Sequence, residues 1–389
     1  MKGIYLDYAA TTPVDKRVTD EMFLYYSEIF GNPSSLHSFG VSAKELLGRS
    51  REKLATLIGA QPEEVIFTSG GTESNNLALK GLAYANCQKG NHIIVSSIEH
   101  DCILNTCRWL ETQGYYISYL PVDSDGVVDT VDLKRLINPK TILVSVMHAN
   151  NEIGTIEPVE EIGEICRYHN ISFHSDACQS FGKIPVDVSQ MAADLLSINA
   201  HKLYGPKGVG ALYVRKGTDL TPQLHGGGQE SGLRSTTENI PGIAGFSRAA
   251  EIAVAGMDKE SGRLISLRNS LTDFLFDNFE NAYINGSIDN RLPGHLNFSF
   301  HGLEGETMRL LLLLDEKGIA VSAGSACSSN DKTHSASHVL QAIGLNQFEA
   351  RGGIRVSFGR YTTNEDFDFF KSTLKESVES LNTIFSLNS

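Results

Sequence analysis

Hydrophobic residues gather in short runs between residues 65 and 215. Six runs of apolar and β-branched residues occupy 65–69, 92–97, 141–147, 171–177, 194–200 and 210–215. Longer amphipathic stretches, such as PVEEIGEICRYH at 158–169, separate most of them. Strands that are apolar on both faces and alternate with helices are typical of a mostly parallel sheet with helices on both sides. The pattern therefore predicts an α/β domain whose ligands bind at the carboxyl ends of the strands.

The pattern changes after about residue 260. A long helical stretch at about 260–280 precedes a mixture of shorter elements, with predicted strands at 295–300, 319–323 and 353–359, a helix at about 305–317 and a final helix from about Asn364. This mixture indicates a smaller α+β domain. We therefore expect a large domain over 15–260 and a small domain made of 1–14 and 261–389.

Composition narrows the possible partners. The net charge of −13 argues against a nonspecific grip on nucleic acid, which needs a basic surface. The densest apolar stretch, Leu310–Leu314, is far too short to cross a membrane. The N-terminus MKGIYLDYAATTP lacks the apolar core of a signal peptide, so we expect a cytoplasmic protein.

The cysteines predict no metal site. None of the six forms a CxxC pair or a Cys/His spacing typical of zinc. In a cytosolic chain most should be reduced and act as small buried hydrophobes. Cys327 differs because its segment, AGSACSS at 323–329, offers no large neighbour to bury it. This pattern indicates either an accessible, reactive thiol or a loop that merely contains a cysteine.

A glycine-rich segment follows the first predicted strand. TSGGTESNN at 68–76 opens a helix, and Gly71 and Thr72 can turn backbone N–H groups and a hydroxyl toward an anion. Any strand-to-helix turn can hold Gly-Gly-Thr, but a phosphate site is the functional interpretation. The segment matches neither the G-x-G-x-x-G fingerprint nor the P-loop, which disfavours a Rossmann oxidoreductase or an NTPase.

Two charged side chains follow other predicted strands. Lys202 lies between an apolar strand and a Gly/Pro loop, where it is either a surface lysine or an amine that forms a Schiff base. Asp176 ends a buried strand, where an unpaired carboxylate is costly. It either caps or pairs locally, or it faces a cation such as a protonated pyridine ring.

Polar residues follow the remaining strands. His100 can stack on an aromatic cofactor and shuttle protons, and Asn150 or Asn151 can donate a hydrogen bond, although each can also be an ordinary loop residue. Because the carboxyl ends of parallel strands meet at one edge, these groups should converge. A phosphate, an aromatic ring, a ring nitrogen and an aldehyde are what they would hold. The sequence therefore predicts pyridoxal phosphate (PLP) as the cofactor.

The chain resembles the cysteine desulfurases, which belong to the class V aminotransferase group of fold-type-I PLP-dependent transferases. The similarity runs nearly end to end, and it lies in the motifs YLDYAATTP, FGNPSSLHSFG, FTSGGTESNN, ANNEIG, HSDACQS, AHKLYGPKG, HGGGQESGLRS, GSACSS and IRVSFGR. The long segment between Cys327 and SHVL at 337–340 is similar to the NifS/IscS-like branch. The resemblance implies a large domain with a mostly parallel seven-stranded sheet and a smaller α+β domain.

The resemblance also implies roles for individual residues. Lys202 forms the Schiff base with PLP, Asp176 pairs with the pyridine nitrogen and His100 stacks on the ring. The other cofactor contacts are made to the ring oxygen by Asn151 and Gln179, and to the phosphate by Gly71, Thr72, Asn199 and His201. At position 199 the family usually has Ser instead of Asn, and RSTT at 234–237 replaces the usual R-S-G-T.

Further implied contacts concern the substrate and a second subunit. Thr237 reaches the phosphate of the other subunit's cofactor, so the implied active unit is a homodimer. Asn32 and Arg355 hold the substrate carboxylate, which the forked guanidinium matches well.

The implied function is the conversion of L-cysteine to L-alanine. Cys327 takes the sulfur as a persulfide and passes it to an acceptor protein. Iron–sulfur scaffolds, tRNA thiolation and DNA phosphorothioation all draw on this type of enzyme. The alternatives are a selenocysteine lyase or an aminotransferase on the same scaffold, or a non-catalytic sulfur-transfer subunit. Lys202 and Cys327 argue against the last of these, and an aminotransferase does not need Cys327.

Overall fold

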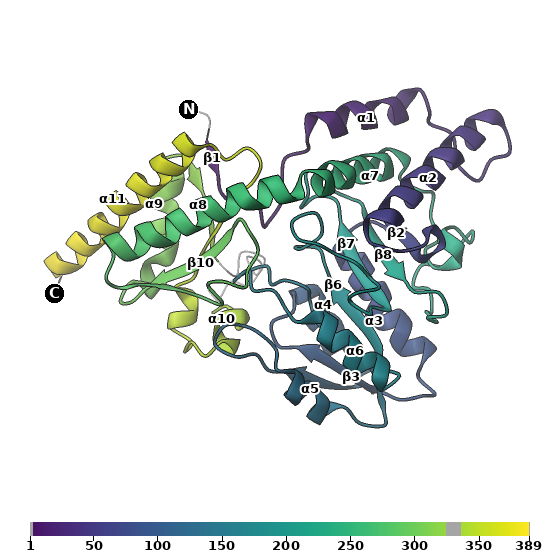
Figure 1. Cartoon of the computed structure of the whole chain (residues 1–389), viewed down its shortest axis with the longest axis horizontal. Helices are drawn as coiled ribbons and strands as arrows, with labels where there is room; N and C mark the ends of the chain where they lie inside the picture. The colour runs from purple at the N-terminus through teal and green to yellow at the C-terminus, as the bar shows by residue number, and fades with distance from the viewer. Residues whose placement is uncertain (1–2, 324–335, 389) are drawn as a thin grey trace.

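A seven-stranded sheet forms the centre of the larger part of the molecule (Figure 1). The structure, a computed structural model, describes residues 3–323 and 336–388. The strand order in the sheet is β2 (Val65–Thr68), β8 (Gly210–Val214), β7 (Leu195–Asn199), β6 (Ser172–Asp176), β5 (Thr141–Ser145), β3 (His92–Ser96) and β4 (Tyr116–Leu120). The strands from β7 to β4 are parallel, and β8 runs antiparallel to both of its neighbours. The predicted α/β fold with a mostly parallel sheet is confirmed.

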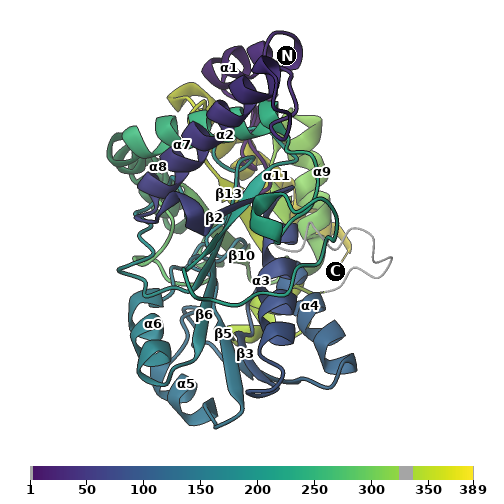
Figure 2. The ribbon, with the colours of Figure 1, turned by 90° about the vertical axis from the view of Figure 1, so that its right-hand side faces the viewer.

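Helices cover both faces of this sheet because its strands are apolar on both sides. In β3, Ile93 and Val95 pack in one core cluster and Ile94 packs in another. The first face carries α3 (Gly71–Ala85) and α4 (Asp101–Thr112), opposite α5 and α6 in Figure 2. The second core includes residues of α1 (Lys16–Ser27), α2 (Ser38–Leu57), α5 (Thr130–Leu136), α6 (Val159–Tyr168) and α7 (Ile240–Ala255).

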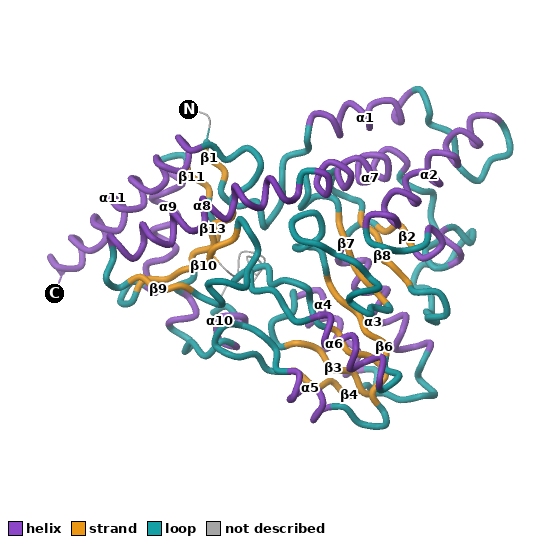
Figure 3. Tube along the Cα trace, in the orientation of Figure 1, coloured by secondary structure: helices purple, strands orange, loops and turns teal. Residues whose placement is uncertain are grey.

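The C-terminal part of the chain builds a separate core beside the large sheet (Figure 3). A four-stranded antiparallel sheet has the order β12 (Ser322–Ala323), β13 (Ile354–Ser357), β10 (His295–Phe300) and β9 (Ala282–Ile284). The helices of this core are α8 (Met257–Asn278), α9 (Thr307–Glu316) and α11 (Asn364–Asn388). The short helix α10 (His338–Ala342) packs instead against Ile98, Met147 and Ile153 of the large unit.

The N-terminal strand joins the C-terminal core across the chain. β1 (Ile4–Tyr5) pairs in parallel with β11 (Ile319–Ala320), and Leu6 is buried among residues of α8 and β10. This pairing places the first residues beside the smaller unit, while the domain boundaries themselves stay a prediction. Within residues 3–323 and 336–388, none of the helices has the length and hydropathy needed to span a lipid bilayer.

Candidate active site

The carboxyl ends of the central strands surround a small cavity of about 170 Å³. Each strand is followed directly by a polar segment that turns toward this space, as expected at the ligand edge of a parallel sheet. The cavity is lined by nine of the residues predicted to hold a cofactor, namely Gly71, Thr72, His100, Asn151, Asp176, Gln179, Asn199, His201 and Lys202. Residues more than 130 positions apart in the sequence, such as Gly71 and Lys202, therefore share one site.

Asp176 places a buried carboxylate at the end of β6. Its Oδ1 accepts a hydrogen bond from the backbone N–H of Cys178 at 2.8 Å, and its Oδ2 accepts one from Asn75 Nδ2 at 2.7 Å. Burial by itself raises the pKa of this carboxyl, but the hydrogen bonds and the nearby Lys202 amine outweigh burial and bring the pKa below 3.8. Asp176 therefore stays ionised at neutral pH and can stabilise a proton on a ligand nitrogen.

His100 presents a neutral imidazole to the cavity. As the N-cap of α4 it accepts a hydrogen bond at Nδ1 from the backbone N–H of Cys102, 3.1 Å away. The proton of the neutral ring must then be on Nε2. Burial, reinforced by Lys202, lowers the pKa of His100 below 6.5. The ring can thus stack on an aromatic ligand and offer an N–H donor.

The first turn of α3 forms the end of the cavity that suits an anion. The backbone N–H groups of a first helical turn lack partners within the helix, and the helix dipole favours negative charge there. A Cβ added at Gly71, the first residue of α3, would lie only 2.6 Å from Cys178 Sγ, so no larger residue fits without movement. Beside Gly71, the buried Asn199 Oδ1 has no hydrogen-bond partner among the described residues. This end of the cavity therefore has room and unused polar groups for a phosphate.

His201 contributes a second neutral imidazole beside Lys202. Its Nδ1 lies 3.1 Å from Thr11 Oγ1. Burial, together with the neighbouring lysines, lowers the pKa of His201 to about 4. The ring therefore acts at neutral pH as an uncharged hydrogen-bonding group.

The two candidate asparagines after β5 have different surroundings. Asn150 is fully buried, donates from Nδ2 to the Ile98 carbonyl at 2.9 Å and accepts at Oδ1 from the N–H of Glu152 at 2.8 Å. These bonds give Asn150 a structural role in the turn. Asn151 instead lines the cavity, and no hydrogen bond of its side chain is present in the described part of the chain. This geometry favours Asn151 as the ligand-binding member of the pair.

Arg355, on β13 of the smaller unit, does not line this cavity but bonds to the backbone of Asn151, which does. Its Nη2 donates to Asp7 Oδ1 and its Nη1 donates to the Asn151 carbonyl, both at 2.9 Å. Its Nε is buried and has no partner among the described residues. Burial raises the pKa of Asp7, although Arg355 opposes the rise. Arg355 therefore connects the two units beside Asn151 and keeps its Nε–H unused.

Three other predicted residues are not brought to this cavity. The exposed Asn32 uses its Oδ1 to accept a hydrogen bond from the backbone N–H of Ser34 at 2.9 Å. Thr237 is exposed and is not part of the cavity wall. Cys327 lies outside the described residues. The predicted roles of these three residues stay predictions.

The donor set fits PLP. Helix N–H groups suit its phosphate, the His100 ring suits its aromatic face, the ionised Asp176 suits its ring nitrogen, and the primary amine of Lys202 suits its aldehyde. The space left by the missing Cβ of Gly71 and the unpartnered Asn199 Oδ1 are both at the end assigned to the phosphate. Every chemical group of PLP therefore has a partner of suitable chemistry in the cavity.

Comparison with known proteins identifies the family. The sequence profile described as Aminotransferase class-V matches residues 4–370. The chain belongs to this family. A relative of this class-V protein from Dictyoglomus turgidum, named Cysteine desulfurase IscS, is 51% identical over 98% of this chain and 96% of its own. A relative of the same name from Methanosarcina thermophila is 47% identical over 98% of this chain and 93% of its own.

Solved structures agree with the fold and the family. A structure titled NIFS-LIKE PROTEIN superposes on the class-V chain with a TM-score of 0.90 and 41% identity, covering 97% of this chain and 99% of its own. Another structure, titled SspA in complex with cysteine, has a TM-score of 0.82 and 41% identity, covering 92% of this chain and 100% of its own. The fold-type-I architecture predicted from the sequence is confirmed, and PLP is the cofactor of this family.

Some cavity residues were not predicted from the sequence. Asn75 stands inside the quoted TSGGTESNN motif, yet only the structure shows that it donates to Asp176. Cys178 lines the cavity beside Gly71, and burial raises the pKa of its thiol well above 9. Of the cysteines in the described residues, Cys107, Cys166 and Cys178 are buried, whereas Cys87 is exposed. The expectation that most cysteines are buried therefore holds for three of the five described, whereas Cys102 is partly exposed and Cys87 is exposed.

Proposed function

We propose that this protein is a PLP-dependent cysteine desulfurase that converts L-cysteine to L-alanine and transfers the sulfur to Cys327. The observation that carries the proposal is the convergence of nine predicted cofactor residues on one cavity, with an ionised Asp176 among them. The 51% identity to a relative named Cysteine desulfurase IscS, over nearly the whole chain, supports the same substrate.

We assign substrate binding to Arg355. Its Nε has no partner among the described residues, and Asp7 and the Asn151 carbonyl hold the other two guanidinium nitrogens in place. A guanidinium fixed in this way can bind the cysteine carboxylate through a charge-assisted hydrogen bond. Asn32 is the second predicted carboxylate ligand.

The residues around the cavity divide the proton chemistry among them. When bound, PLP stores the electron pair that remains on Cα after its proton leaves. Asp176 stays ionised and keeps a proton on the ring nitrogen. Lys202 holds the cofactor and then takes the Cα proton, and His100 offers its Nε2–H on the face of the ring. Each of these roles is a proposal for a residue that lines the cavity.

The sulfur transfer requires one further thiol. The Cys327 sulfur forms an S–S bond to the substrate sulfur while the Cβ–S bond breaks. Cβ gains a proton and is reduced, the two sulfurs become a persulfide, and alanine leaves, so one cysteine and one protein thiol give one alanine and one persulfide.

Other cysteines near the site are poor candidates for this step. Burial raises the pKa of Cys102 to about 12 and also raises the pKa of Cys178 well above its usual value of 9. A thiol attacks as its thiolate, which such a shift suppresses. This argument supports Cys327, together with its sequence motif, as the sulfur carrier.

We further propose a homodimer that hands its sulfur to an acceptor protein. Thr237 is exposed and absent from the cavity of its own protomer, as a residue that serves the other subunit should be. An ion pair between Arg234 and Glu73, with Nε to Oε1 at 2.7 Å, ties the segment before Thr237 to the first turn of α3. Light scattering of the purified protein tests the dimer.

The function itself is tested by following both products. Purified protein loaded with PLP is incubated with L-cysteine and a thiol reductant, and alanine and sulfide are measured together. Equal amounts of the two products support a desulfurase. Keto acid formation that depends on an added amino acceptor would instead assign an aminotransferase.

A further inference from the structure

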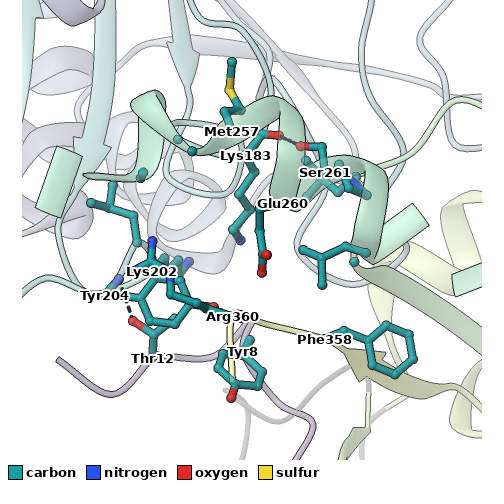
Figure 4. Close-up of a pocket in the computed structure, with 18 of the residues that line it drawn as sticks. Tyr8, Thr12, Lys183, Lys202, Tyr204, Met257, Glu260, Ser261, Phe358 and Arg360 are labelled. Atoms are coloured by element: carbon teal, nitrogen blue, oxygen red, sulfur yellow. Dashed lines mark hydrogen bonds between the residues drawn. The ribbon is translucent and has the colours of Figure 1, made fainter. Parts of the chain in front are cut away.

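Lys183 is a partly buried amine that the proposed reaction does not use. It follows β6 and lines a cavity of about 590 Å³, whose other walls include the segment after β7, the start of α8 and the segment after β13 (Figure 4). Lys202 lines this cavity as well as the cofactor cavity. The two spaces are also connected by a hydrogen bond, in which Lys183 Nζ donates to Gln179 Oε1 at 3.1 Å. Gln179 in turn lines the cofactor cavity.

The partners of Gln179 fix which way its amide points. A lysine ammonium can only donate, so it selects the amide oxygen. On the other side the Ala9 carbonyl can only accept, and it accepts from Gln179 Nε2 at 2.9 Å. The reversed amide would put its NH₂ group against the ammonium and its oxygen against a carbonyl oxygen. Both partners therefore demand the same orientation, and one N–H of the amide is left unused by the described residues.

The surroundings of the Lys183 amine are unfavourable for its charged form. Burial, followed by the positive charges of Lys202 and Arg355, lowers the pKa of its amine to about 7. The carboxylate of Glu260 lines the same cavity, but its ion pair is with Arg263, at 2.8 Å. No ion pair of Lys183 is present in the described part of the chain. Functional sites retain side chains of this kind, whose charge has no ion-pair partner and does not stabilise the fold.

We propose that Lys183 is a positioning residue that fixes the Gln179 amide so that its free N–H faces the bound cofactor. This inference rests on the proposed function only through PLP as the ligand. Lys202 and Arg355 act on the charge of the Lys183 amine, which in turn acts on His201 and His295. The other titratable groups of this cavity include Glu260, Tyr8 and Tyr204. Lys183 acts through Gln179, because the hydrogen bond to Oε1 is its direct connection to the wall of the cofactor cavity.

The test measures PLP binding to the cofactor-free protein by absorbance titration. Lys183→Met and Gln179→Leu should each weaken binding about tenfold, the effect of one lost hydrogen bond to a fixed donor. Because the two residues act in series, the double variant should be no weaker than the weaker single variant. The visible spectrum of the loaded protein should shift in the same direction in both single variants.

Controls separate positioning from folding. Lys259→Met removes an exposed amine from the same cavity and should bind PLP like the unmodified protein. Lys183→Arg keeps a cationic donor and should recover most of the affinity. If Lys183→Met does not fold, Lys183→Leu, which also removes the donor to Gln179, takes its place.

Two results would overturn the inference. One is unchanged PLP affinity in a folded Lys183→Met protein, and the other is a double variant weakened about a hundredfold, as expected for independent sites. Neither result depends on turnover of L-cysteine. If the unmodified protein showed no desulfurase activity, the proposed function would be refuted, but this inference would still stand.

Discussion

Glu99 offers a quantitative test of the electrostatics beneath the site. Its side chain is fully buried directly before His100, and its Oε1 accepts hydrogen bonds from Ser96 Oγ and from the Met147 backbone N–H, both at 2.7 Å. Burial raises the pKa of this carboxyl from 4.5 to about 8, and the charge of Asp176 reinforces the rise. The two hydrogen bonds oppose the rise without cancelling it.

The sign of the pH effect follows from this shift. Below pH 4.5 the group is protonated in both the folded and the unfolded chain. Between pH 4.5 and about 8 the unfolded chain loses the proton while the folded chain keeps it, so stability falls as pH rises. Each pH unit in this range lowers the free energy of unfolding by about 1.4 kcal/mol. The total loss, complete above pH 8, is therefore at most about 5 kcal/mol. Glu99→Gln removes the ionisation and should avoid this loss.

The assay is urea unfolding of the cofactor-free protein at pH 5 and pH 9, at one fixed protein concentration. Glu99→Gln should unfold with nearly the same free energy as the unmodified protein at pH 5, and should be several kcal/mol more stable at pH 9. Glu111→Gln, which removes the same charge from the exposed surface of α4, is the matched control. A gap of the same size at both pH values, or a less stable Glu99→Gln at pH 9, would refute the reasoning.

Three further predictions concern the cofactor. Asp176→Asn keeps an acceptor for the Cys178 N–H but loses the negative charge. The protein should therefore still bind PLP, while alanine formation falls roughly a hundredfold. Near-normal turnover would show that the carboxylate has only a structural role. In Lys202→Ala, borohydride should no longer fix PLP to the chain, as judged by the mass of the protein, and a fixed adduct would contradict the assignment. Gly71→Ala puts a Cβ 2.6 Å from Cys178 Sγ and should weaken PLP binding at least tenfold. Gly48→Ala, which has open space around its Cβ, should bind PLP normally. Equal affinities in the two variants would argue against a phosphate site at Gly71.

The sequence predicted the central strands well because they are apolar on both faces. It missed β4, Tyr116–Leu120, which lies at the edge of the sheet with Tyr116 and Tyr119 exposed. Only Ile117 and Leu120 of this strand are buried, one on each face, so a search for continuous apolar runs passes over it. The predicted strand at 319–323 is two strands, because β11 pairs with β1 while β12 turns to pair with β13. Pairing partners so far apart in the chain leave no local signal.

The site was predictable where a residue follows a strand directly. Asp176 and Lys202 could be placed in this way, because the ends of parallel strands must meet. The residue pattern by itself left Asn150 and Asn151 open, and the family resemblance implied Asn151. The structure adds the reason, because the turn uses the Asn150 side chain for its own backbone. Lys183 gave no signal, since its importance arises from a hydrogen bond to Gln179 and from burial by distant segments.

Direct detection of sulfur on Cys327 tests the central proposal most sharply. The PLP-loaded protein is mixed briefly with L-cysteine, alkylated and digested, and the peptides are analysed by mass spectrometry. The account predicts one additional sulfur on the peptide that contains Cys327, and Cys327→Ser should bind PLP normally but form no protein persulfide. Additional sulfur first on Cys102 or Cys178, or alanine release at the normal rate from Cys327→Ser, would contradict the account.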